Sequence, residues 1–152
     1  MIFFHFIYIL SLVVWIGSIV FFSFFTAPVV FKILDREQAG EVVGAIFCGY
    51  YRIGYVCGIL AIASLIGSLP TLSDGRLVIL PLMVLCTFFA GMVVGPKARN
   101  LKERIKSEGG PGNVPGLKAQ FDKLHSASVR LNGIVLILGL TVLWLTAGSL
   151  NF

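Results

Sequence analysis

Four long apolar segments constrain this chain more than any other feature. They cover residues 2–25, 53–69, 77–95 and 131–150, and none of them contains Asp, Glu, Lys or Arg. Because a helix needs about 20 residues to cross the ~30 Å hydrocarbon core of a bilayer, each segment is close to the length of one crossing. Barrel strands would be only about 10 residues long and would alternate strictly. The sequence therefore predicts an all-α integral membrane protein with four transmembrane helices.

Composition places the whole chain in one membrane-embedded unit. Of its 152 residues, 57% are hydrophobic and 12% are charged, whereas soluble domains contain about 45–50% apolar and about 25% charged residues. This length suits one compact unit, so we expect a single transmembrane domain over residues 1–152, folded as a four-helix bundle. Cys48, Cys57 and Cys86 form no CxxC motif. We interpret them as small apolar helix residues rather than as a disulfide framework or a metal site.

The positive charges predict how the chain is oriented. Eleven of the twelve Lys and Arg residues fall on the side reached after the first span, and only Arg76 falls on the opposite side. Short loops rich in Lys and Arg stay in the cytoplasm, so we expect both termini outside, in the periplasm of a bacterial inner membrane. The basic face would attract anionic lipid headgroups, and no nucleic-acid-binding module accompanies it. The eleven residues are Lys32, Arg36, Arg52, Lys97, Arg99, Lys102, Arg104, Lys106, Lys118, Lys123 and Arg130.

Polar sequence before the second span predicts that this helix begins in the cytoplasm. Asp35 is a candidate N-cap, and acidic residues follow it in the first turns, where they favour a helix N-terminus. The second helix is therefore expected to begin near Arg36, unless residues 36–52 form a separate interfacial helix.

Residues 97–130 are predicted to form a cytoplasmic helical hairpin between the third and fourth spans. Pro96 should kink or end the third helix, and the helix-favouring residues after it can continue as a stalk. Residues 109–116 are rich in Gly and Pro and predict a turn, after which the chain leads back into the fourth span. The expected fold thus has cytoplasmic extensions of the second, third and fourth helices.

Two pairs of glycines predict close helix packing. Gly54 and Gly58 are four residues apart, as are Gly91 and Gly95. Small residues at this spacing let membrane helices approach each other closely. The glycines indicate either contacts within the four-helix bundle or an interface between copies in a homo-oligomer.

Polar side chains gather at the cytoplasmic ends of the predicted spans. His125, Ser128 and Asn132 follow a helical spacing that places them on one face of the fourth helix. Because polar groups within a membrane are costly, they are candidates for function. We expect a pocket, open to the cytoplasm, for a small molecule or an ion; alternatively, these groups cap helix ends and reach toward headgroups. The candidate residues are Tyr51, Arg52, Arg99, His125, Ser128 and Asn132.

Cofactor and catalytic signals are weak. His5 and His125 could ligate haem or a metal, but they are predicted near opposite ends of the spans, roughly 25–30 Å apart. One iron or metal ion could not bind both. No GxSxG, HExxH or phosphate-loop motif occurs, and the missing intramembrane carboxylate weakens a proton-coupled transporter. We expect a protein without enzymatic activity and without a cofactor, with haem as an alternative.

Three stretches of the sequence resemble a four-helix membrane family of largely unknown function that includes the eukaryotic transmembrane protein 205 and many bacterial members. The resemblance covers nearly the whole chain and implies a membrane protein without enzymatic activity. A link of the eukaryotic member to platinum-drug resistance implies metal or small-molecule handling. The place where the family carries a histidine before its tryptophan falls near Tyr8 here. The matching residues are Trp15, Gly17, Ala27, Pro28, Phe31, Ala39, Gly40, Phe47, Tyr50 and Tyr51, residues 95–110, and Phe121, His125, Ser128 and Asn132.

Three hypotheses about function follow. The first is a membrane protein whose cytoplasmic-side pocket binds or passes a small molecule or ion. The second is an accessory subunit of a larger membrane complex, in which residues 97–123 would be the docking surface. The third is a haem-dependent oxidoreductase or a metal-binding membrane protein.

Overall fold

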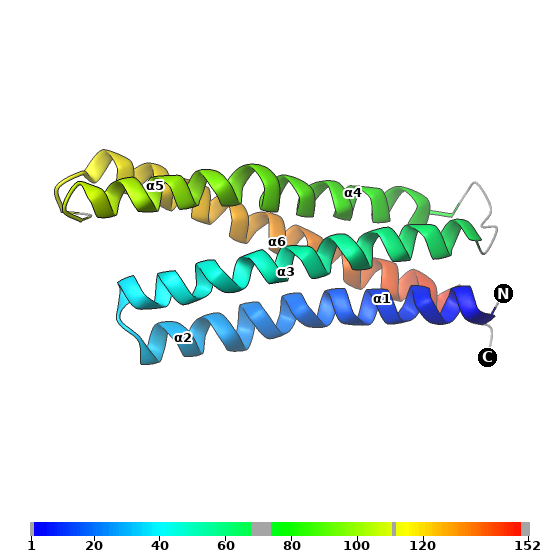
Figure 1. Ribbon diagram of the computed structural model, residues 1–152. Helices are drawn as coiled ribbons and strands as arrows, with labels where there is room; N and C mark the ends of the chain where they lie inside the picture. Colours follow the sequence, from blue (N-terminus) through cyan, green and yellow to red (C-terminus); the bar gives the residue numbers. More distant parts are fainter. Residues whose placement is uncertain (1, 68–73, 111, 150–152) are drawn as a thin grey trace.

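The computed structural model describes residues 2–67, 74–110 and 112–149, and nearly all of them are helical (Figure 1). The described residues form four long helical rods, two of which contain a segment of wider π-helix. The elements are α1 (Ile2–Val20), η1 (Phe21–Thr26), α2 (Ala27–Ile33), α3 (Arg36–Gly67), α4 (Arg76–Phe88), η2 (Phe89–Val94), α5 (Gly95–Ser107) and α6 (Pro115–Ser149).

The rods match the prediction of four membrane-crossing helices. The candidate spans Ile2–Ile33, Gln38–Gly67, Arg76–Ser107 and Pro115–Ser149 contain 32, 30, 32 and 35 residues, and each is apolar enough to cross a membrane. This confirms an all-helical chain with four helices of the required length and composition. The predicted span ends at residues 69 and 150 lie outside the described residues, as does the side chain of Arg36, one of the eleven basic residues.

The helices are longer than the apolar segments alone indicated. Residues 36–52 belong to the unbroken helix α3, so they do not form a separate helix. The predicted turn at residues 109–116 ends early, because α6 already begins at Pro115. Proline suits the first turn of a helix, where its missing N–H would have no partner. Gly109 and Gly110 have φ angles of 86° and 103°, which glycine adopts without steric cost.

The third rod does not end at Pro96. Helix α5 continues through it, and the π-helix η2 ends two residues before it, at Val94. The first rod repeats this arrangement, since η1 ends at Thr26 and Pro28 follows within α2. A proline ring clashes with the carbonyl four residues earlier in a regular α-helix. A wider turn at that place changes the position of this carbonyl, so the rod can continue.

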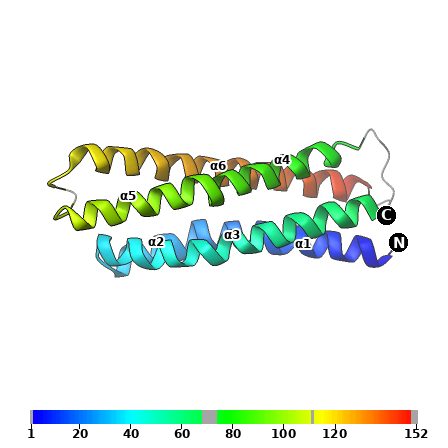
Figure 2. The same cartoon turned by 45° about the horizontal axis from the view of Figure 1, so that its top comes forward.

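Each rod packs against two neighbours (Figures 1 and 2). Helix α1 contacts α3 and α6, and α4 contacts α3 and α6. One end of the molecule, here called the basic end, holds the connection between α2 and α3 and the loop between α5 and α6. The other, here called the terminal end, holds the start of α1 and the end of α6. The largest fully buried side chains are Trp15, Leu12, Ile19, Leu80, Met83, Val135 and Val142.

The outer surface of the rods is strongly apolar. Large side chains on all four rods are exposed, among them Ile59, Leu85, Ile137 and Trp144, whose exposed fraction is 80%. A soluble monomer rarely exposes a contiguous apolar surface of this extent. Lipid contact explains the surface, since apolar residues on the outside of a membrane helix remain out of water.

Candidate functional site

A polar contact joins α3 to α6 about halfway along α3. The hydroxyl oxygens of Tyr51 and Ser128 lie 2.9 Å apart, and the side chain of Asn132 also interacts with the Tyr51 hydroxyl. Ser128 and Asn132 are four residues apart on α6, so they occupy the same face of that helix. Tyr51 and Asn132 are buried, with exposed fractions of 7% and 9%. We call these three residues the Tyr51 cluster.

Aromatic rings of α3 and η1 form a connected group around Tyr51. The Tyr51 ring stacks on Phe47 with centroids 5.6 Å apart and meets the edge of Tyr50 at 5.1 Å. Phe22, from the π-helix η1, lies 4.8 Å from Phe47 and 5.2 Å from Tyr50. Pairs at these distances add stability beyond their buried area. Tyr51 therefore belongs to an aromatic group that extends from α3 to the first rod.

Tyr55 holds a buried hydroxyl that makes no hydrogen bond within the described part of the chain. It lies one turn from Tyr51 on α3, and both side chains rest on Gly91 of the π-helix η2. A Cβ atom added to Gly91 would lie 2.1 Å from the Tyr55 hydroxyl oxygen and 2.8 Å from Cγ of Tyr51. Only glycine leaves room for both tyrosines at this point. Sequence reasoning did not single out Tyr55, because neither its residue type nor its spacing marks it.

The other three residues predicted for a pocket lie outside the Tyr51 cluster. Arg52 is exposed on α3. Arg99 is exposed, and its Nη1 donates to Sγ of Cys48 at 3.1 Å. His125 is exposed on α6 and stacks on Phe121, with ring centroids 6.2 Å apart. The structure thus brings Tyr51, Ser128 and Asn132 together and leaves the two arginines and the histidine on the surface.

The predicted packing glycines differ in how close the side chains of neighbouring helices come to them. A Cβ atom on Gly54 would lie 2.9 Å from Thr87 and 3.1 Å from Trp15, and one on Gly58 would lie 2.6 Å from Val84. At Gly95 the nearest atom is the carbonyl oxygen of Ala90 at 3.5 Å, which is an ordinary contact.

Gly139 on α6 is a close-packing glycine that the spacing argument missed. A Cβ atom there would lie 2.9 Å from Ile16. No second small residue at the same spacing marks this position in the sequence.

A second polar contact ties the rods together at the terminal end. The hydroxyl oxygens of Tyr8 and Thr146 lie 3.2 Å apart, and the Arg76 guanidinium carbon lies 6.0 Å from the centre of the Tyr8 ring. Nε of Arg76 donates to both carboxylate oxygens of Asp74, at 2.8 and 2.9 Å. Nη1 of Arg76 reaches Ser149 at 3.3 Å. This network links the starts of α1 and α4 to the end of α6.

The histidines and cysteines do not converge. His5 lies near the start of α1 at the terminal end, and His125 lies on α6 toward the basic end. Cys48, Cys57 and Cys86 are free thiols. Within residues 2–67, 74–110 and 112–149, no three His, Cys, Asp or Glu side chains group so that they could hold a metal ion.

Comparison with known proteins gives a family match. A family model described as a domain of unknown function (DUF4149) matches residues 10–107, which include Tyr51, Tyr55 and Gly91 but not α6. An uncharacterized protein of Aquifex aeolicus (strain VF5) is 32% identical over 136 residues, which cover 87% of this chain and 86% of that protein. No solved structure matches.

Proposed function

The chain belongs to the family described as a domain of unknown function (DUF4149), and we propose that it is a non-enzymatic multi-pass membrane protein that binds a small polar molecule or ion at the Tyr51 cluster. One observation carries this proposal: the hydroxyl of Tyr55 is buried against Gly91, close to the base of the Tyr51 side chain, without a hydrogen-bond partner among the described residues. An unpaired buried hydroxyl costs about 1–3 kcal/mol. A bound guest would remove that cost.

The groups at the cluster suit an uncharged polar guest or a weakly held ion. Within the cluster, the hydroxyls of Tyr51 and Ser128 both donate and accept hydrogen bonds, and the amide of Asn132 does the same through separate atoms. The neighbouring Tyr55 adds a further hydroxyl. The surrounding aromatic faces also attract cations. Arg52 and His125 are exposed and would act at the entrance rather than at the guest.

The proposal includes a membrane arrangement. The four rods form a four-helix bundle in a bacterial inner membrane, with the basic end in the cytoplasm and both termini in the periplasm. The excess of Lys and Arg at the basic end supports this orientation. We also propose that the chain is related to the eukaryotic transmembrane protein 205. The residue matches around Trp15, Tyr50 and Tyr51 support this relationship.

Cysteine labelling tests the orientation. Cys48 is exposed toward the basic end, whereas Cys57 is buried. In a Cys57→Ser/Cys86→Ser variant, a membrane-impermeant maleimide should label Cys48 in inside-out vesicles and not in intact spheroplasts. The reverse pattern would overturn the orientation.

Ligand-dependent thermal stability tests the binding proposal. The purified protein in detergent is heated with zinc chloride, sodium chloride, haemin or glycerol, and its unfolding temperature is measured. We expect at least one of these to raise that temperature by about 2–4 °C. Tyr55→Phe should abolish the rise, and it should also make the ligand-free protein more stable because it removes the unpaired hydroxyl.

Tyr8→Phe is the matched control for this experiment. It removes a buried tyrosine hydroxyl at the terminal end, so it should keep the ligand-dependent rise. The binding proposal fails if no probe stabilises the wild type, or if Tyr55→Phe keeps the full rise.

A further inference from the structure

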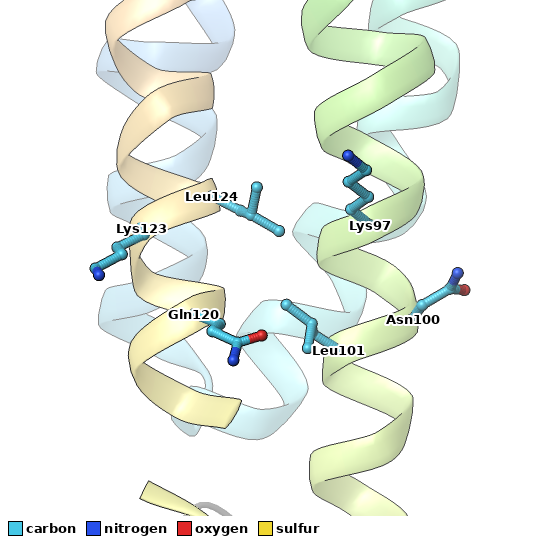
Figure 3. A pocket seen from close by; sticks show the side chains of 6 residues that line it. All are labelled: Lys97, Asn100, Leu101, Gln120, Lys123 and Leu124. Atoms are coloured by element: carbon cyan, nitrogen blue, oxygen red, sulfur yellow. The ribbon is translucent and has the colours of Figure 1, made fainter. Parts of the chain in front are cut away.

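A groove of about 450 Å³ opens between α5 and α6 at the basic end (Figure 3). Each helix contributes one lysine, one amide and one leucine, spaced so that the three share a face of their helix. Leu101, Leu124 and Gln120 point into the space between the helices, Lys97 runs along α5 beside it, and Asn100 and Lys123 point outward, away from that space. The lining residues are Lys97, Asn100 and Leu101 of α5 and Gln120, Lys123 and Leu124 of α6.

The groove carries positive charge that the protein itself does not neutralise. Neither Lys97 nor Lys123 has an ion-pair partner in the part of the chain that the structure describes, whereas Lys106 pairs with Glu41 at 2.9 Å. Helix α5 contains five Lys or Arg residues and a single acidic residue. Neither acidic residue of the two facing helix segments, Glu103 of α5 or Asp122 of α6, lines the groove. An anion is therefore the complementary ligand.

The position of the groove selects the kind of anion. Lys97 lies two residues after Gly95, where the apolar part of the third rod ends, so the groove is level with the boundary between lipid tails and headgroups. Its half-buried leucines offer an apolar contact beside the lysines. A soluble anion would gain nothing from that contact, whereas a phospholipid presents a phosphate and an apolar glycerol and acyl region together.

We propose that the groove between α5 and α6 binds the headgroup of an anionic phospholipid. Gln120 hydrogen-bonds to the polar headgroup, Leu101 and Leu124 contact the start of the acyl chains, and the exposed Lys97 and Lys123 side chains turn toward the phosphate. Basic pockets between membrane helices near the cytoplasmic surface bind lipid headgroups by the same combination. This inference requires only that the rods cross a membrane, and it does not depend on a guest at the Tyr51 cluster.

Lipid-dependent stability of the full-length protein tests the proposal. The protein in a zwitterionic detergent is titrated with phosphatidylglycerol or with phosphatidylcholine, and the unfolding temperature is followed. We expect phosphatidylglycerol to stabilise the wild type in a saturable way, with phosphatidylcholine much less effective. Lys97→Gln/Lys123→Gln should weaken the apparent affinity for phosphatidylglycerol by roughly 10- to 30-fold.

A matched double variant separates the groove from general charge. Lys32→Gln/Lys118→Gln removes the same charge from exposed lysines that do not line the groove, and it should bind phosphatidylglycerol like the wild type. Equal weakening in both double variants would overturn the proposal, because it would show attraction to the basic end as a whole. Equal stabilisation of the wild type by the two lipids would overturn it too.

Two soluble probes test the choice of a lipid. Inorganic phosphate or a short acidic peptide, added without lipid, should not reproduce the stabilisation. If either stabilises the wild type as phosphatidylglycerol does and loses its effect in Lys97→Gln/Lys123→Gln, the groove binds a soluble ligand and the lipid assignment is wrong. All four exchanged lysines are exposed, so the lipid-free unfolding temperatures should stay close to that of the wild type.

Discussion

The hydroxyl oxygens of Tyr51 and Ser128 lie 2.9 Å apart, although 77 positions separate the two residues in the chain. This contact crosses from α3 to α6 within an apolar interior. A polar group in such surroundings is costly unless it is paired, so the contact specifies how these two rods are rotated relative to each other.

Tyr51→Phe should lower the free energy of unfolding by about 0.5–1.5 kcal/mol. The variant keeps the ring stacking but leaves Ser128 and Asn132 without the tyrosine hydroxyl. Reversible unfolding in mixed micelles measures the loss. Tyr51→Phe combined with Ser128→Ala should lose less than the sum of the single variants, because they share one contact. The exposed Ser126→Ala is the control and should match the wild type; additive losses would contradict the shared contact.

Gly91→Ala should destabilise the protein by about 1–3 kcal/mol, since overpacking forces side chains off their rotamers. The new methyl group would collide with the hydroxyl oxygen of Tyr55 and with Cγ of Tyr51. Gly95→Ala is the matched control four residues later on the same rod, where the nearest atom is 3.5 Å away. The packing account fails if both substitutions change the unfolding temperature equally.

The two tryptophans should respond differently to quenching by brominated lipid. Trp144 is 80% exposed on the outer surface of α6, whereas Trp15 is 1% exposed in the core. In bilayers of lipid brominated along the acyl chains, Trp15→Phe protein should lose most of its emission, because only Trp144 then emits. Trp144→Phe protein should lose little. Equal quenching of the two variants would show that Trp144 does not face lipid tails.

Acid should weaken the network at the terminal end. Hydrogen bonds from the Arg76 guanidinium hold the pKa of Asp74 below its ordinary value, which is about 3.9. A carboxyl group with a lowered pKa stabilises the folded state above its ordinary pKa, and that contribution is lost as the pH falls through the lowered value.

Asp74→Asn should therefore lose less thermal stability than the wild type between about pH 5 and pH 3. Asp122→Asn is the control, because it removes an exposed carboxyl group that has no ion pair among the described residues. Its unfolding temperature should fall with pH as that of the wild type does. Parallel curves for wild type and Asp74→Asn would contradict a stabilising role for the carboxylate.

The sequence by itself determined the four membrane-crossing helices and the charge asymmetry between the two ends. Both follow from local properties. A membrane helix satisfies its backbone hydrogen bonds within one segment, so an uninterrupted apolar run is enough to predict it. The sequence left open whether the third rod ends, kinks or continues at Pro96, because the π-helix that accommodates the proline depends on how a carbonyl before it is displaced.

Only the tertiary structure decided which polar residues meet. From the sequence, Tyr51, Arg52 and His125 were equally good candidates for one pocket, since all three lie at the same predicted level. Their positions around the helix axes separate them, and those positions depend on packing between rods. Gly91 lets Tyr51 and Tyr55 lean toward the third rod, and Gly139 lets α6 approach Ile16. Helix periodicity describes one helix at a time, so it contains no information on the rotation and shift that bring Tyr51 to Ser128.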